Sequence, residues 1–192
     1  MANRVRRTIK RIATGVGVAV ACLAAYLTYI HKTGNFDTLV PGEVFRSAQV
    51  VGTDLSDYRQ QYGIKSVLNL RGAAPDSRWY SAEIAESNRL ALVHADFAMS
   101  ASERITPDQV FELIALMKRL PKPLLIHCRH GSDRTGLASA LYLAAIEGAE
   151  EETAEAQLSL YYGHFAVPYL SDAYPMDETW EVMEMALGFP NS

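Results

Sequence analysis

The sequence predicts an α/β fold: a central, mostly parallel sheet flanked by helices, with an N-terminal transmembrane helix in front of it. Three observations support this prediction. Short apolar runs typical of buried strands alternate with longer stretches of helical periodicity. The chain has 192 residues, of which 49% are hydrophobic, enough for one sizeable core and an extension. An uncharged run near the N-terminus is long enough to cross a bilayer.

Residues 1–32 form a segment of their own, basic at its start and apolar afterwards. Five Arg and Lys residues between positions 4 and 11 precede an uncharged run of 19 residues, 12–30. About 20 residues span a bilayer as a helix. Because the basic residues precede the run, the positive-inside rule places the N-terminus in the cytoplasm. We therefore expect a single-pass anchor in the inner (cell) membrane and a periplasmic or otherwise extracytoplasmic domain, with a cleaved signal sequence as the alternative.

Composition limits the partners of the domain that follows. All 22 acidic residues come after position 32, together with 12 of the 18 Lys and Arg residues, so residues 33–192 carry a net charge of −10. This balance argues against nucleic acid as a partner. The two cysteines, Cys22 and Cys128, lie in very different settings, so no disulfide framework is indicated.

Residues 33–41 are expected to be a linker, and residues 42–192 the folded domain. Within the domain, Thr106 followed by Pro107 is a typical helix start, and Gly63 and Gly148 are expected to end helices. In chain order, we expect a strand at Val44 and Phe45, a helix at 54–62, a strand at 64–70, a helix at 77–89, a strand at 91–97, a helix from 107 with Val110, Leu113, Ile114 and Met117 at helical spacing, a strand at 124–126, and helices at 137–146, 150–162 and 177–187.

The stretch from Leu124 to Gly136 organises the rest of the chain. An apolar strand leads into a loop that holds Cys128, and Arg134 follows six positions later, just before an Ala- and Leu-rich helix. A strand, a tight loop and a helix N-terminus together form an anion site, since backbone N–H groups and the helix dipole point into the loop. Arg134 can hold two oxygens of a phosphate. A Cys in this cradle is expected to be a thiolate, and beneath a phosphate it is a nucleophile.

Two other interpretations of this loop explain less. A buried Cys in an ordinary turn leaves Arg134 and the two glycines of the stretch without a reason. A metal site built from His127, Cys128 and His130 lacks a second cluster of ligands, and adjacent residues on a strand point to opposite faces. We therefore expect neither a metal nor a cofactor.

The pattern of Cys128, five residues and then Arg-Thr-Gly, with His127 in front, resembles the protein tyrosine and dual-specificity phosphatase superfamily. Gly42–Gln49 resembles the opening of its bacterial members. The resemblance implies a phosphomonoester hydrolase with a phosphocysteine intermediate, in which Arg134 binds the phosphate and Thr135 hydrogen-bonds the Cys sulfur. The other residues expected to form or line the phosphate loop are His127, Arg129, His130, Gly131, Ser132 and Gly136.

Cleavage of a phosphate ester also needs a carboxyl group that protonates the leaving oxygen. Asp96 is the first candidate, because it follows a strand end 32 residues before Cys128. The general acid of dual-specificity phosphatases lies about as far upstream. Asp133, inside the loop, is the competitor and resembles the loop Asp of lipid-acting and bacterial branches, among them the myotubularins. Arg71 is a candidate support of the loop from the next strand end.

The expected substrate is a phosphorylated protein, and the alternative is a membrane lipid, an inositol phosphate or an envelope saccharide phosphate. The N-terminal helix would hold the site near the bilayer. A non-catalytic phosphate-binding module is disfavoured, because a nucleophile, an Arg, a Thr and candidate acids are all present. A rhodanese-like sulfur transferase fits the Arg-Thr-Gly ending less well.

Overall fold

The computed structural model describes residues 2–189. The first residue of the predicted anchor segment and the last three residues of the predicted domain, 190–192, lie outside the described residues. One sheet has the strand order β1-β2-β5-β3-β4. The pairs β2–β5, β5–β3 and β3–β4 are parallel, and β1 runs antiparallel to β2 at the edge. The predicted mostly parallel sheet is confirmed. The strands are β1 (Asp37–Val40), β2 (Val44–Ser47), β3 (Ser66–Asn69), β4 (Val93–Asp96) and β5 (Leu124–His127).

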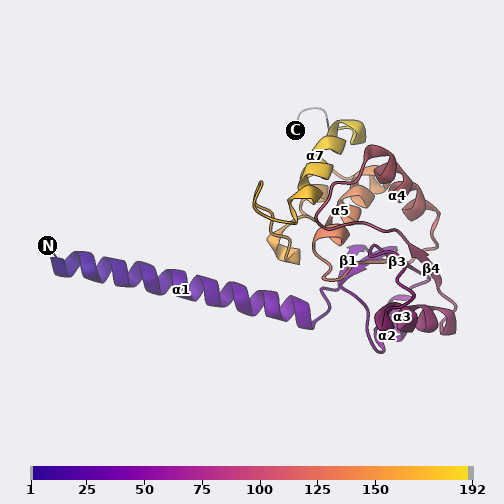
Figure 1. The fold of residues 1–192 in the computed structure, drawn as a ribbon, viewed down its shortest axis with the longest axis horizontal. Helices are drawn as coiled ribbons and strands as arrows, with labels where there is room; N and C mark the ends of the chain where they lie inside the picture. Colours follow the sequence, from indigo (N-terminus) through magenta and orange to yellow (C-terminus); the bar gives the residue numbers. More distant parts are fainter. Residues whose placement is uncertain (1, 190–192) are drawn as a thin grey trace.

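Helices cover both faces of this sheet (Figure 1). Helices α4, α5 and α7 lie on one face, and α2 and α3 lie on the other. A π-helical turn extends α5, and a short 3-10 turn follows α6. The helical elements are α1 (Ala2–Lys32), α2 (Asp54–Tyr62), α3 (Arg78–Arg89), α4 (Pro107–Arg119), α5 (Asp133–Tyr142), η1 (Leu143–Glu147), α6 (Glu151–Glu155), η2 (Leu160–Tyr162) and α7 (Tyr174–Leu187).

The alternation of side chains along the inner strands builds a core on each side of the sheet. Leu124 and Ile126 of β5 pack in the larger core, which also contains Trp180 of α7. Leu125, between them, points to the other face and packs in the smaller core with Leu55 of α2. Strand β5 is therefore buried on both faces, and the loop that follows it starts from a rigid support.

Most predicted boundaries lie close to the observed ones. Helix α2 starts and ends as predicted, and Gly63 and Gly148 form left-handed helix ends. Thr106 caps α4 in a reciprocal pair with Gln109. Helix α7 begins three residues before its predicted start, and α5 begins four residues before its predicted start. The first turn of α5 therefore takes in part of the loop that follows β5.

The predicted linker at 33–41 is corrected by the structure, because it contains β1. Residues of β1 pair with Val44, Phe45 and Arg46 of β2. An edge strand pairs on one side only and is incompletely buried, so its sequence lacks the apolar run that marks an inner strand. The Ala48 N–H also donates to the carbonyl of Gly34 at 2.7 Å. The chain therefore enters the domain directly after α1.

The predicted helix at 150–162 is wrong beyond Glu155. Helix α6 ends there, and a turn leads into η2. The carbonyl and the side chain of Gln157 both accept hydrogen bonds from Arg46. The same carbonyl oxygen lies 2.8 Å from the position that a Cβ on Gly136 would take. These tertiary contacts outweigh the helix propensity of the segment.

Helix α1 leaves the domain as a long, exposed helix (Figure 1). Within residues 2–189 it is the one helix that is long and apolar enough to cross a membrane, and its apolar stretch is not buried by the rest of the chain. By length and composition, it fits either an anchor or a signal sequence.

Candidate active site

The loop after β5 curls around the sulfur of Cys128. Cys128 is 2% exposed, and the N–H of Gly131 donates to its Sγ at 3.3 Å. Gly131 has φ +73°, and a Cβ there would lie 2.7 Å from the backbone nitrogen of Ala48. Only glycine fits this position without displacing β2. The nearby backbone after β2 thus restricts position 131 to glycine, and the N–H of this glycine points to the sulfur.

A buried arginine that we had not assigned supports the same loop from β2. Arg46 is fully buried, and its guanidinium donates to the carbonyl of Gly131 at 2.8 Å. It stacks on the ring of Tyr162 at 3.5 Å. Burial lowers the pKa of Arg46 to about 10, while Tyr162 and Cys128 act in the opposite direction. Arg46 therefore remains charged at neutral pH and adds positive charge beneath the loop.

Behind Cys128, His127 belongs to a buried network centred on Glu83 of α3. His127 Nε2 donates to Glu83 Oε1 at 3.0 Å, and His94 Nε2 donates to the same oxygen at 2.7 Å. Gln49 donates to the other oxygen and accepts from Arg71 Nη1 at 2.6 Å. Burial would raise the pKa of Glu83, but the hydrogen bonds from the two histidines outweigh burial and lower it to about 2. This network orients His127, which is fully buried behind the loop and does not line its opening.

Three guanidinium groups surround the mouth of the loop. Burial lowers the pKa of Arg71, and the nearby charges of Arg134 and Arg129 lower it further. Arg71 also stacks on the ring of Trp79 at 3.5 Å. Arg129 is exposed at the rim. An acidic domain thus concentrates positive charge at one loop, which is the arrangement that an anionic substrate requires.

Two side chains of the signature carry buried polar atoms that have no partner within residues 2–189. These atoms are Nε of Arg134 and Oγ1 of Thr135. Arg134 Nη1 donates to the carbonyl of Met99, in the loop after β4, at 3.2 Å. The predicted hydrogen bond from Thr135 to the Cys sulfur is not formed in this arrangement. Buried polar atoms are normally paired, so both groups are available to an anion bound in the loop.

Asp96 ends β4 and lies beside Asn69, which in turn lies beside His127 in the sheet. Both oxygens of its carboxylate accept hydrogen bonds: Oδ1 from Asn69 Nδ2 at 2.7 Å, and Oδ2 from the hydroxyl of Tyr80 at 2.5 Å. The hydrogen bond to Asp96, together with burial, raises the pKa of Tyr80 to about 12. Asp96 is therefore held by both of its oxygens, between β3 and α3.

Asp133, the first residue of α5, is bound differently. Its Oδ1 accepts from Nδ1 of His164 at 2.8 Å, and Nε2 of His164 donates to Oδ2 of Asp177 on α7 at 2.9 Å. Burial would lower the pKa of His164, but the two carboxylates outweigh burial and raise it to about 9. A buried imidazolium therefore joins the catalytic loop to α7.

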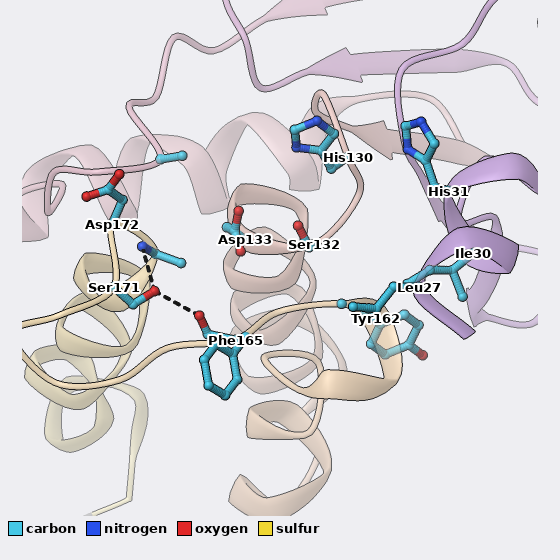
Figure 2. A pocket seen from close by; sticks show the side chains of 13 residues that line it. Leu27, Ile30, His31, His130, Ser132, Asp133, Tyr162, Phe165, Ser171 and Asp172 are labelled. Atoms are coloured by element: carbon cyan, nitrogen blue, oxygen red, sulfur yellow. Dashed lines mark hydrogen bonds between the residues drawn. The ribbon is translucent and has the colours of Figure 1, made fainter. Parts of the chain in front are cut away.

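A cleft of about 420 Å³ opens beside this loop (Figure 2). Ser132 and Asp133 lie at its centre, and His130 stands on the rim opposite His31 of α1. The rings of the two histidines are 6.3 Å apart. Cys128, Arg134 and Asp96 do not line this cleft, which adjoins the loop at Ser132 and Asp133. The cleft is lined by Leu27, Ile30, His31, Ala101, His130, Ser132, Asp133, Tyr162, Gly163, Phe165, Ser171, Asp172 and Ala173.

Several of these supports were not predicted from the sequence. Arg46 carried a usable signal, because a charged residue in an apolar strand must find a partner when it is buried. Glu83 and His164 carried none, since each meets its partner in the loop across 44 or 31 residues of chain. Asn35 was placed in the linker, but its side-chain amide donates to the carbonyls of His130 and Tyr162.

Comparison with known proteins agrees with this geometry. The family model described as Swiss Army Knife protein, DSP-PTPase phosphatase domain (PTP-SAK), matches residues 33–175. No curated protein matches the chain. Among solved structures, P. aeruginosa TpbA is similar with a TM-score of 0.60 and 20% identity, over 83% of this chain and 93% of that one. The catalytic domain of the S. cerevisiae PP-IP phosphatase SIW14 has a TM-score of 0.58 and 17% identity, over 79% and 92%. PTPMT1 in complex with PI(5)P has a TM-score of 0.58 and 11% identity, over 79% and 97%. These structures share the fold.

Proposed function

Because the chain belongs to the PTP-SAK family of DSP-PTPase phosphatase domains, we propose that it hydrolyses phosphate monoesters through a phosphocysteine intermediate on Cys128. The observation that carries this proposal is the loop itself. The sulfur of Cys128 accepts a backbone N–H, and the N-terminus of α5 adds positive charge. Arg134 follows in the first turn of the same helix, with an unpaired buried nitrogen. A phosphate bound in this loop would have the sulfur of Cys128 next to its phosphorus atom, and Arg134 and the loop amides next to its oxygens.

Two steps follow from this arrangement. In the first, the thiolate of Cys128 attacks phosphorus, the bond from phosphorus to the leaving oxygen breaks, and a carboxyl group gives that oxygen a proton. In the second, a water molecule attacks phosphorus, the carboxylate takes its proton, and the phosphorus–sulfur bond breaks to release phosphate. Arg134 and the loop amides stabilise the equatorial oxygens in both steps.

For the proton donor, Asp133 now has stronger support than Asp96, which was the first choice from sequence. Asp133 lies next to Arg134 in the first turn of α5, and one of its oxygens remains without a hydrogen bond from the described chain, although the other is paired with the charged His164. Both oxygens of Asp96 are engaged, by Asn69 and Tyr80. We therefore propose Asp133 as the acid, with Asp96 as the alternative.

Two classes of substrate are candidates for this activity: phosphoproteins, and phosphorylated lipids or inositols. Crystal structures of fold relatives hold phosphotyrosine in TpbA and PI(5)P in PTPMT1.

We further propose that α1 is retained as an anchor, with its N-terminus in the cytoplasm, because the basic residues precede its apolar run. The domain would then lie on the opposite side of the membrane.

The nucleophile is tested with the full chain in detergent micelles and p-nitrophenyl phosphate as substrate. Cys128→Ser should abolish turnover while phosphate still binds, because the loop remains. Arg134→Ala should lower kcat/KM by at least about a hundredfold, because it removes a charge that stabilises the transition state. If Cys128→Ser retained most of the activity, the covalent mechanism would be wrong.

The proton donor is tested by varying the leaving group. Asp133→Asn should slow hydrolysis of an alkyl phosphate by about a hundredfold, and slow p-nitrophenyl phosphate much less, because nitrophenolate departs without a proton. Asp96→Asn is the matched variant. If only Asp96→Asn showed this dependence on the leaving group, Asp96 would be the acid.

A further inference from the structure

The C-terminal end of α1 forms one wall of the cleft that adjoins the loop of Cys128. Leu27, Ile30 and His31 line it opposite His130 and Asp133 (Figure 2). Leu27 and Ile30 belong to the uncharged run of 19 residues that is long enough to span a bilayer. The apolar run and the wall of the cleft therefore overlap in sequence.

No spacer separates this helix from the domain. The N–H of Asn35 donates to the carbonyl of Ile30 at 2.8 Å, and the side chain of Asn35 donates to the carbonyl of His130 at 3.1 Å. The hydroxyl of Tyr26 donates to the carbonyl of Tyr161 at 2.5 Å. Tyr26 precedes Ile30 by four residues, about 6 Å along the helix axis. If the run spans the bilayer, the segment around Tyr161 lies at the level of the membrane interface.

The segment that follows exposes apolar side chains beside this helix end. Tyr161 and Phe165 are more than half exposed, Tyr169 is 94% exposed and Leu170 is 85% exposed. The loop that carries the last two residues, drawn in orange-yellow, extends from the domain on the side from which α1 departs (Figure 1). Aromatic side chains are favoured where hydrocarbon meets water, and leucine is favoured in the hydrocarbon. We call Tyr161, Phe165, Tyr169 and Leu170 the interfacial patch.

Basic side chains lie beside the cleft, although the domain as a whole is acidic. Lys32 and His31 end α1, and Arg129 lies with them around a second hollow beside the loop. Asp54 is the acidic residue of that hollow. Positive groups at the membrane surface attract anionic headgroups. The basic hollow and the apolar cleft thus adjoin at His31, at the end of the domain from which α1 departs.

We propose that the loop of Cys128, together with the cleft that adjoins it, takes the phosphate monoester headgroup of a membrane lipid, presented by the bilayer that holds α1, with the interfacial patch inserted in that bilayer. This proposal rests on the proposed phosphatase activity and on α1 being retained. The lipid oxygen leaves with the proton of the carboxyl group, water supplies the oxygen that replaces it on phosphorus, and the lipid alcohol stays in the membrane.

The test uses the full chain in phosphatidylcholine vesicles that carry phosphatidic acid. Glycerol 3-phosphate is the soluble comparator, because it has the same kind of leaving oxygen, and a phosphotyrosine peptide is the competing substrate. Phosphatidic acid should be hydrolysed with the highest kcat/KM. The double variant Tyr169→Ser, Leu170→Ser should lower its hydrolysis by about tenfold. Neither residue lines the cleft, so turnover of p-nitrophenyl phosphate should be unchanged.

Met185→Ser is the control, because Met185 is 77% exposed on α7 but outside the interfacial patch. It should alter neither activity. A second measurement does not depend on turnover: in a Cys128→Ser background, Tyr169→Trp should add fluorescence that brominated lipid chains quench. Unquenched fluorescence, or faster hydrolysis of the peptide than of phosphatidic acid, would overturn the lipid proposal alone. Absence of Cys128-dependent hydrolysis of p-nitrophenyl phosphate would overturn the proposed function as well.

Discussion

Replacing His164 by glutamine should remove a pH-dependent part of the stability of the domain. His164 is 3% exposed and bridges Asp133 and Asp177. The two carboxylates, working against burial, raise its pKa from 6.5 to about 9. Each unit of pKa corresponds to about 1.4 kcal/mol, so the charged form stabilises the fold by about 3 kcal/mol at most. Because the pKa is raised in the folded state, this stabilisation is complete below about pH 6.5 and is lost as the pH rises through about 9.

The assay is urea unfolding of the full chain in detergent micelles, followed by the fluorescence of the buried Trp180 on α7. His164→Gln should be less stable than the unmodified chain by about 3 kcal/mol at about pH 6, and the difference should shrink by about pH 9.5. His31→Gln, which removes an exposed imidazole, is the control and should leave the pH profile unchanged. Identical pH profiles for His164→Gln and the unmodified chain would refute the charge bridge.

Two further variants test the supports of the loop. Gly131→Ala should lose most activity and destabilise the protein more than Gly63→Ala does. Both positions have positive φ, which costs a residue with a side chain about 1–2 kcal/mol. Only at Gly131 would a Cβ also meet backbone, at 2.7 Å. Urea unfolding of the two variants measures the difference in their free energies of unfolding. Equal losses would mean that the close approach is unimportant. Glu83→Gln should lower the free energy of unfolding by about 1–3 kcal/mol and reduce kcat, because it weakens the acceptor that holds His127 and His94. Glu86→Gln on the same helix should change neither quantity, and an equal loss there would contradict the role of the network.

Local patterns in the sequence were sufficient for much of the fold. Helix α2 and the capped start of α4 are specified by residues close together in the chain, through a left-handed Gly63 and the pair of Thr106 and Gln109. Strand β5 was visible as an apolar run because it is buried on both faces. The edge strand β1 and the end of α6 were not visible, because each depends on partners that lie elsewhere in the chain.

The sequence by itself determined the family, the class of fold and the loop that holds Cys128 and Arg134. These follow from short-range order, since a strand, a loop and a helix N-terminus are contiguous. Only the tertiary structure decided what surrounds that loop: Arg46 beneath it, Glu83 behind it, His164 beside Asp133 and the end of α1 across the cleft. Spacing along a chain constrains neighbours within a few residues, whereas these contacts arise when strands pair and helices pack. The proposal of Asp133 over Asp96 as the acid depends on such contacts, and the leaving-group experiment tests it.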